Sequence, residues 1–420
     1  MPKRINLGRI MESQLPAELV NFMWVAGEIA HARGEGIYLV GGVVRDLLLG
    51  QANLDLDLVV EGNAIELAQQ LKKINKAKLT THPHFNTAKL QWDKWSVDLT
   101  SARSETYDKP GALPTVKPGS IDDDLARRDF TINAMAIRLN PGDYGKLVDL
   151  HDGRDDLKRK RIRVLHEKSF IDDATRIWRG LRYEQRLDFH LERETLNLLK
   201  RDIPMLDTIS ADRIRYEIEC ILKERCPEKV LSRAEELGVL ATLHPALKGN
   251  GWLAEKFEQA RKVSSPDPPG VGLYLALVAY PLTMEETESL ISRLRLPKAL
   301  AQTLRDTITL KGKIRSISTP GLSSSGIYSL LEAYSPPAMV ANSLATESPA
   351  ASQNIHLYLT RLKYIEISLT GKDLIQMGIA PGPHIREIID LLHQARLDGK
   401  ITTKQDEVDL VKRWLAKKQG

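Results

Sequence analysis

The chain has 420 residues, of which 42% are hydrophobic and 27% charged, so it is long enough for two to four folded modules with apolar cores. It has no run of eighteen apolar residues and no apolar stretch of the signal-peptide type, so we expect a cytoplasmic protein with no membrane partner. The two cysteines, Cys220 and Cys226, have no partners at metal-ligand spacing, which argues against a disulfide framework or a zinc site. A net charge of +5 permits nucleic-acid binding without establishing it.

Short apolar runs alternate with helical patterns in the first third of the chain, and they predict strands at 37–40, 54–60, 88–92 and 97–100. From about Leu157 onward the helical period dominates. We therefore expect an α+β fold, in which a domain with a mixed sheet is followed by helices. Clusters of Pro, Gly and Ser predict breaks between these helices at 264–270, 316–325 and 335–337.

A glycine pair, Gly41 and Gly42, follows the first predicted strand and precedes a predicted helix at 44–49. Backbone amides in such a turn can face a phosphate at the N-terminus of the helix, and Arg45 would add a positive charge. By itself a Gly-Gly pair between a strand and a helix is more often only a turn.

Asp55 and Asp57 stand two residues apart on the next predicted strand, so both carboxylates should lie on one face, with the leucines at 54, 56 and 58 on the other. Adjacent carboxylates repel each other unless a cation lies between them, and their hard oxygens suit Mg²⁺, as in metal-assisted phosphoryl transfer. The alternative for an isolated Asp-x-Asp is a solvent-facing edge strand. Asp98, on a neighbouring predicted strand, is either a third catalytic acid or a buried residue that caps a turn.

The segment 124–136, Asp-Leu-Ala-Arg-Arg-Asp-Phe-Thr-Ile-Asn-Ala-Met-Ala, joins two arginines and an aspartate to an apolar run. Arg128 can reach triphosphate or ribose oxygens, and Asp129 can orient it or accept a hydrogen bond from a ribose hydroxyl. Taken alone, the tripeptide would more simply be a surface ion pair of little energetic value.

Residues 170–186 fit a helical wheel on which an apolar stripe opposes an arc of Arg176, Arg179, Arg182 and Arg186, with Asp173 near its edge. A carboxylate only accepts hydrogen bonds and a guanidinium only donates them. Cytosine and adenine both offer an amine donor beside a ring-nitrogen acceptor, whereas uracil and guanine offer a carbonyl beside a ring N–H. An Asp173–Arg176 pair would therefore admit C and A and reject U and G. The alternative is an ordinary amphipathic helix with an (i, i+3) ion pair.

These motifs, in this order, resemble those of class II tRNA nucleotidyltransferases and bacterial poly(A) polymerases, which belong to the polymerase-β-like superfamily. The resemblance implies a nucleotidyltransferase head at 1–156, a helical neck with the nucleotide-selecting motif at 157–225, and a helical body and tail that bind tRNA at 226–420. Asp172 stands where the family has Glu in its Glu-Asp-x-x-Arg motif, a change that keeps the carboxylate. The segment 209–217 matches a following neck helix, for which we expect a structural role.

The resemblance also implies roles for individual residues. Asp55 and Asp57 would bind two magnesium ions as catalytic residues. The triphosphate and ribose would be bound by Gly41, Gly42, Arg45, Arg128 and Asp129. The base would be selected and held by Asp173, Arg176 and Arg179, with support from Arg182.

The predicted reaction is the transfer of CMP or AMP from CTP or ATP to the 3′ end of tRNA without a nucleic-acid template. Complete CCA addition, CC addition and terminal A addition remain open. The segment 101–124 is uninterrupted, whereas CC-only relatives tend to lose a flexible loop there, which favours A or full CCA addition. A poly(A) polymerase is the nearest alternative, and an RNA-binding protein without catalysis is an alternative of another class. The sequence does not indicate an oligomeric state.

Overall fold

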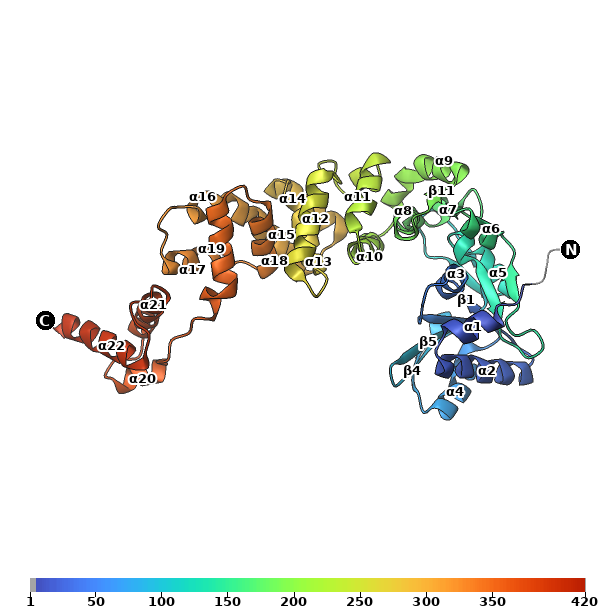
Figure 1. Ribbon diagram of the computed structural model, residues 1–420, viewed down its shortest axis with the longest axis horizontal. Coiled ribbons are helices and arrows are strands. Elements are labelled where there is room, and N and C mark those ends of the chain that lie inside the picture. Colours follow the sequence, from blue (N-terminus) through green and yellow to red (C-terminus); the bar gives the residue numbers. More distant parts are fainter. Residues whose placement is uncertain (1–4, 420) are drawn as a thin grey trace. The chain divides into compact units, whose positions relative to one another are not determined.

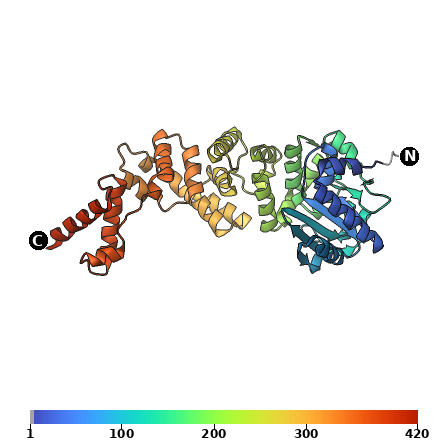
Figure 2. The same cartoon turned by 60° about the horizontal axis from the view of Figure 1, so that its bottom comes forward.

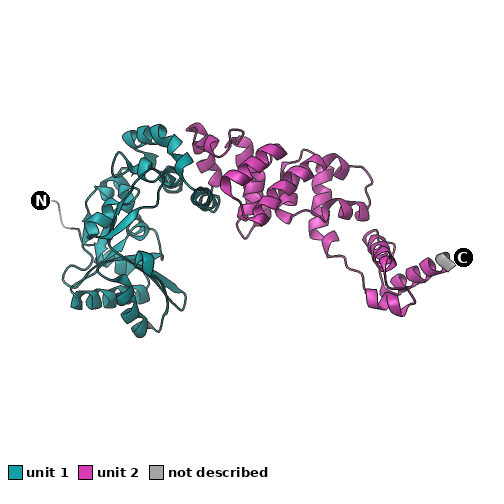
Figure 3. Cartoon of the chain, turned by 180° about the vertical axis from the view of Figure 1, so that it is seen from behind, with its two compact units in different colours: residues 1–225 teal, residues 226–420 magenta. Residues whose placement is uncertain are grey.

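The computed structural model describes residues 5–419 of the chain, except for the side chains of Asn75 and residues 417–419. It divides into two compact units, unit 1 at Met1–Arg225 and unit 2 at Cys226–Gly420 (Figure 3). Each unit is described by itself. The predicted division into head, neck, body and tail stays a prediction.

Unit 1 is built around a seven-stranded sheet in the order β3-β4-β5-β2-β1-β8-β9. Figure 1 labels β1, β4 and β5 of this sheet. The strands are β1 (Gly36–Val40), β2 (Leu56–Glu61), β3 (Lys78–His82), β4 (Thr87–Trp92), β5 (Trp95–Ser101), β8 (Met135–Arg138) and β9 (Leu147–Asp149). Strands β2 and β5 are parallel, and the other adjacent pairs are antiparallel. The sheet is therefore mixed, as the sequence predicted, and all four predicted strands are present.

Both faces of the sheet centre are buried, which explains why β1 reads as a continuous apolar run. Ile37 and Leu39 are fully buried on one face. Tyr38 and Val40, on the other face, pack in a hydrophobic cluster with helix α5 (Ile121–Ala126). Helix α2 (Ala17–Ala32) contacts β1 and helix α4 (Ala64–Asn75), and it is the long blue helix beside the sheet in Figure 2. The remaining helices before β2 are α1 (Gly8–Gln14) and α3 (Gly42–Leu49).

The rest of unit 1 consists of a hairpin, helices and two short strands, some of which line the pocket described below. They comprise the hairpin β6 (Arg103–Thr106) and β7 (Thr115–Pro118), helices α6 (Gly153–Lys158), α7 (Ser169–Asp172), α8 (Thr175–Leu187), α9 (Arg193–Asp202) and α10 (Ala211–Leu222), and the short strands β10 (Arg161–Ile162) and β11 (His190–Leu191). The parallel pair of β10 and β11 was not predicted, because two-residue strands leave no periodic pattern.

Two local expectations were wrong. The helix drawn over 170–186 is interrupted, because Asp173 is extended (φ −143°, ψ 95°) between α7 and α8. Leu54 does not share the buried face of Leu56 and Leu58, because it precedes the first residue of β2 and is 45% exposed.

Unit 2 consists of helices, and its described residues contain no strand. Its α-helices are α11 (Pro227–Glu236), α12 (Gly251–Ser264), α13 (Val271–Ala279), α14 (Met284–Leu294), α15 (Lys298–Gly312), α16 (Ile314–Ile317), α17 (Ser324–Leu331), α18 (Pro336–Ala345), α19 (Pro349–Thr360), α20 (Gly371–Gln376), α21 (Pro383–Leu397) and α22 (Lys404–Gln419). The three predicted breaks fall between α12 and α13, between α16 and α17, and at the start of α18. Among the described residues, no helix has the length and apolar character needed to cross a membrane.

Candidate active site

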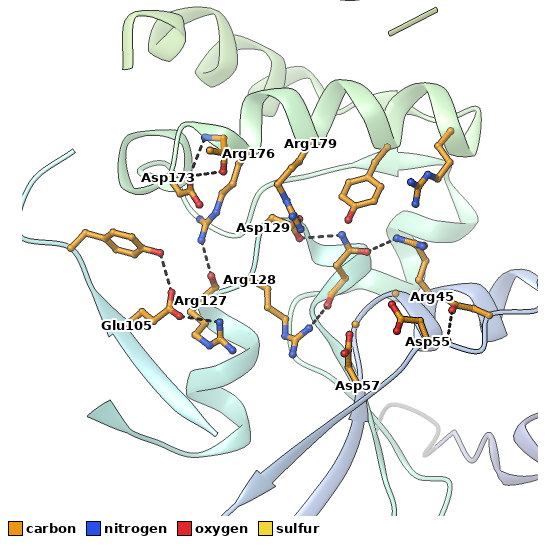
Figure 4. A pocket seen from close by; sticks show the side chains of 18 residues that line it. Arg45, Asp55, Asp57, Glu105, Arg127, Arg128, Asp129, Asp173, Arg176 and Arg179 are labelled. Atoms are coloured by element: carbon orange, nitrogen blue, oxygen red, sulfur yellow. Dashed lines mark hydrogen bonds and ion pairs between the residues drawn. The ribbon is translucent and has the colours of Figure 1, made fainter. Parts of the chain in front are cut away.

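Unit 1 contains a pocket of about 470 Å³ where the end of β1, the start of β2, the β6–β7 hairpin, helix α5 and helix α8 meet (Figure 4). Most of the predicted site residues line it. They are Gly41, Gly42, Arg45, Asp55, Asp57, Arg128, Asp129, Asp173, Arg176 and Arg179. Asp98 and Arg182 are not among the lining residues.

The glycine pair forms the turn that the sequence predicted. Gly41 has a φ of 76° and caps helix α3, which begins at Gly42. A side chain at Gly41 would be strained by that φ, and its Cβ would lie 3.0 Å from Arg128 Nη1. Glycine therefore lets the turn approach an arginine of the opposite wall.

Arg45 is 4% exposed, and each of its three guanidinium nitrogens donates a hydrogen bond. Its Nε and Nη2 donate to the two carboxylate oxygens of Asp46, at 2.8 and 3.0 Å, and its Nη1 donates to Asn133 Oδ1 at 2.8 Å. Asn133 Nδ2 in turn donates to Asp129 Oδ1 at 3.1 Å. The positive charge beside the glycine turn is thus fixed before any ligand binds.

Asp57 lies on β2 between Val40 of β1 and Asp98 of β5 in the sheet register, and Asp55 immediately precedes the strand. Surrounding protein and the charges of Asp55 and Asp98 raise the pKa of Asp57 to about 6, against a lowering by Arg128. Although protein surrounds most of the carboxylate, the side chain is open to solvent through the pocket. Two carboxylates that raise each other's energy and face open space fit a divalent cation.

Asp98 sits beside Asp57 in the register, and its Oδ2 pairs with Lys89 Nζ at 3.0 Å. Within the described part of the chain, no three His, Cys, Asp or Glu side chains gather as a metal-binding group. Two protein carboxylates are enough where substrate phosphates and waters complete the coordination of Mg²⁺. The role of Asp98 as a third acid stays a prediction.

Asp129 ties the Arg-Arg-Asp segment to helix α8. Its Oδ2 accepts from Arg179 Nε at 2.9 Å and Nη2 at 2.6 Å, and its Oδ1 accepts from the Phe130 amide at 2.8 Å. Burial alone would raise the pKa of Asp129, but the charge and hydrogen bonds of Arg179 and the bond from Asn133 lower it to about 2. The Asp129 charge also raises the pKa of Arg179. The pair is ionised at any physiological pH.

Asp173 and Arg176 do not form the alternative (i, i+3) ion pair. Asp173 Oδ1 accepts from the Thr175 amide at 3.0 Å and from Arg213 Nη2 at 2.8 Å. Arg176 Nη1 donates to Ser169 Oγ at 2.8 Å, and its Nη2 donates to the backbone oxygen of Arg127 at 2.7 Å. These interactions engage Oδ1 of Asp173 and the two terminal nitrogens of Arg176, so Asp173 Oδ2 and Arg176 Nε are the acceptor and the donor that a ligand could use.

Helix α10 supports Asp173 and two arginines of helix α8. Besides the contact of Arg213 with Asp173, Glu217 accepts from Arg182 Nη2 at 3.3 Å and pairs with Arg179 Nη1 at 3.8 Å. Burial raises the pKa of Glu217, against the lowering effect of these two arginines. The segment 209–217, for which a structural role was expected, contacts residues that line the pocket. Arg182 does not line the pocket but pairs with Glu217 of this segment.

Sequence reasoning missed several lining residues: Asn53, Glu105, Tyr107, Arg127, Asn133, Thr175, Tyr183 and Arg186. Tyr183 is the aromatic centre of the arginine wall, with the guanidinium carbons of Arg45, Arg179, Arg182 and Arg186 at 5.3 to 5.8 Å from its ring centroid. A signal for Tyr183 existed, since it lies on the helix that carries three of these arginines. Glu105 and Tyr107 lie on a hairpin with no motif of its own.

Comparison with known proteins gives two family matches. Residues 37–163 match the model of the poly A polymerase head domain, and residues 188–249 match a probable RNA and SrmB-binding site of polymerase A. The head-domain match covers every lining residue from Gly41 to Asn133. The fold and the pocket therefore define a nucleotidyltransferase.

Similar proteins and solved structures show which kind of nucleotidyltransferase the chain resembles. The chain is 34% identical to an A-adding tRNA nucleotidyltransferase of Halalkalibacterium halodurans, over 99% of this chain and 97% of the relative. It is also 34% identical to an A-adding tRNA nucleotidyltransferase of Geobacter sulfurreducens over 98% of this chain, although it spans only 49% of that protein's length. The structure of a CCA-adding enzyme in an apo form is similar with a TM-score of 0.82 at 32% identity, covering 98% of this chain and 99% of the other. The chain belongs to the tRNA nucleotidyltransferase family.

Proposed function

We propose that the chain transfers AMP, or CMP and AMP, from ATP and CTP to the 3′ end of tRNA in the cytoplasm. The observation that carries this proposal is that one pocket is lined both by the carboxylates of Asp55 and Asp57 and by Asp173 and Arg176. The first pair suits nucleotidyl transfer of any kind. The second pair supplies the choice of base.

Base choice follows from the atoms left open. Asp173 Oδ2 can accept from the exocyclic amine of cytosine or adenine, and Arg176 Nε can donate to the neighbouring ring nitrogen. Uracil or guanine would set a carbonyl against the carboxylate and an N–H against the guanidinium. Because the wrong base leaves buried polar groups unpaired, a site of this kind can discriminate strongly.

The triphosphate would lie between the glycine turn and the arginines. The amides at the start of α3, together with Arg45 and Arg128, would bind phosphate oxygens, and Asp129 would keep Arg179 oriented toward the nucleotide. Asp55 and Asp57 would hold two Mg²⁺ ions, which when bound activate the attacking tRNA hydroxyl and neutralise the leaving pyrophosphate. Arg182 would support the site through Glu217 and α10.

Terminal A addition is the first candidate, because A-adding relatives match over nearly the whole chain. Full CCA addition is the second, because the fold matches that of a CCA-adding enzyme over 98% of the chain. A poly(A) polymerase would share the pocket and would differ in accepting unstructured RNA.

The test offers the protein tRNAs that end before CCA, after CC and after CCA, each with one labelled nucleotide. Incorporation of A onto the CC end alone indicates terminal A addition, and incorporation of C onto the shortest tRNA indicates CCA or CC addition. Extension of an unstructured RNA as fast as tRNA would favour a poly(A) polymerase. Equal incorporation of UTP and GTP would contradict base selection by Asp173 and Arg176, and activity in an Asp55→Ala, Asp57→Ala variant would contradict the metal assignment.

A further inference from the structure

One carboxylate behind the pocket holds two of its arginines at once. Asp124, on α5, is fully buried and does not line the pocket. Its Oδ1 accepts from Arg127 Nε at 3.0 Å and Nη2 at 2.6 Å. Its Oδ2 accepts from Arg128 Nε at 3.3 Å and Nη2 at 2.9 Å. Each oxygen thus receives a two-pronged guanidinium, and both guanidinium groups face the pocket.

This arrangement costs free energy that a surface pair would not. A fully buried carboxylate needs complete pairing, and replacing such groups by apolar side chains is often neutral or stabilising. Two guanidinium groups share the single charge of Asp124, and Arg127 Nη1 turns to Glu105 Oε1 at 3.1 Å. Arg128 has no second carboxylate hydrogen bond among the described residues, and its positive charge faces the pocket on the side of Asp57. A bound triphosphate would neutralise that charge.

The segment formed by Arg127 and Arg128 reaches both ends of the pocket. Arg128 Nη1 lies against the glycine turn at Gly41, on the side of Asp57. The backbone oxygen of Arg127 accepts from Arg176 Nη2 at 2.7 Å, on the side of the base (Figure 4). Two consecutive residues anchored by one buried carboxylate therefore contact the groups assigned to the triphosphate and to the base.

We propose that Asp124 is a positioning residue that fixes Arg128 for the triphosphate and, through the backbone of Arg127, fixes Arg176 for the base. The two halves of nucleotide recognition are then set by one buried group. The proposal rests on the proposed function only in that the pocket binds a nucleoside triphosphate.

The first test measures binding of inorganic tripolyphosphate, which has no base, by calorimetry in Mg²⁺ buffer. Asp124→Asn should weaken binding by about 10- to 100-fold, the effect typical of removing a supporting partner or misplacing a binding group by ~1 Å. Asp122→Asn is the matched control, because the exposed carboxylate of Asp122 lies on the same helix outside the pocket. The variant should bind tripolyphosphate with the affinity of the wild type.

A double-mutant cycle separates positioning from general damage. If Asp124 acts through Arg128, then Asp124→Asn should have little further effect on tripolyphosphate binding in an Arg128→Gln background. Additive effects of the two substitutions, or wild-type affinity in Asp124→Asn, would overturn the proposal. Should Asp124→Asn not fold, Asp124→Glu keeps the charge but displaces the carboxylate by one methylene. It should then weaken tripolyphosphate binding in the same direction, and wild-type affinity in that folded variant would overturn the proposal.

The link to the base has its own measurement, the ratio of CTP and ATP incorporation to UTP and GTP incorporation. This ratio should fall in Asp124→Asn, because Arg176 loses a fixed acceptor. A variant that is only partly folded has lower activity with an unchanged ratio, which would overturn the coupling. Failure of the proposed function is distinguishable, because wild-type protein that transfers no nucleotide can still be tested for tripolyphosphate binding.

Discussion

The pocket has a carboxylate wall, formed by Asp55 and Asp57, and an arginine wall, formed by Asp129 and by Arg45, Arg179 and Arg186 around Tyr183. The two walls differ in how far the protein itself balances their charges. On the carboxylate wall, Asp57 and Asp55 raise each other's energy, and the pKa of Asp57 rises to about 6. On the arginine wall, Asp129 and Arg179 neutralise each other, and the pKa of Asp129 falls to about 2. The protein therefore leaves the negative charge of one wall unbalanced, whereas it balances and preorganises the charges of the other. Preorganised charges need no rearrangement when the nucleotide binds.

The largest expected effect is on the carboxylate wall. Asp57→Asn keeps the shape of the side chain but removes the charge that would hold a metal ion, so kcat should fall by about 1000-fold or more, since metal-ion stabilisation is worth several kcal/mol. Single-turnover transfer to tRNA ending in CC measures it. Asp188→Asn, at an exposed turn after α8, is the control and should keep wild-type activity. An Asp98→Asn variant tests whether Asp98 is a third metal ligand, because its kcat should then fall by a comparable factor. Activity of Asp57→Asn within tenfold of the wild type would contradict the carboxylate wall.

A substitution in the arginine wall should lower the stability of the folded protein. Asp129→Asn leaves Arg179 without its buried partner, which should lower the free energy of unfolding by about 3 kcal/mol, or Tm by about 6–12 °C in a unit of this size. Because the pKa of Asp129 lies below its unfolded value, its stabilisation is present above about pH 4 and is lost as the pH falls toward about 2. The difference between variant and wild type in urea unfolding should therefore shrink between pH 4 and pH 2. A difference that stays constant would contradict the ion pair as its source.

The contrast between the walls also explains how much the sequence could predict. The carboxylate wall is local, since a strand, a glycine turn and Asp-x-Asp all lie within residues 36–57, and a mixed sheet with four of its seven strands was predicted. The arginine wall and its supports come from separate segments, which carry Arg45, Asp129, Asp173 and Arg213, so their hydrogen bonds follow from tertiary packing. The helix break at Asp173 was missed in part for the same reason, because its carboxylate binds the nearby Thr175 amide and also Arg213 of a distant helix. Glu105 and Tyr107 left no signal at all.

A smaller effect should appear in base selection. Arg213→Gln removes the ion pair behind Asp173 while leaving the residues at the pocket unchanged, so preference for CTP and ATP over UTP and GTP should fall by about tenfold, corresponding to ~1.4 kcal/mol. Competition between labelled nucleotides measures this ratio. Arg215→Gln on the same helix is the matched control, because Arg215 pairs with Asp212 and Glu219. Equal selectivity of Arg213→Gln and the control would indicate that Asp173 needs no support from α10.

The smallest expected effect is the pH dependence that the unbalanced carboxylates confer. Because the folded pKa of Asp57 is about 6, above the ordinary value of about 4, folding favours its protonated form, and stability falls as the pH rises from about 4 through 6. Without metal, Asp57→Asn should therefore be more stable than the wild type at pH 7, by on the order of 1 kcal/mol after allowance for solvent screening in the open pocket. The two proteins should be equally stable at pH 4. Saturating Mg²⁺ should abolish the difference at pH 7, since the cation stabilises only the charged pair and is bound by the folded protein. Thermal unfolding across this pH range, with and without Mg²⁺, measures both effects. If Asp57→Asn were instead less stable at pH 7 without metal, the carboxylate wall would already be balanced by the protein, and the two walls would not differ.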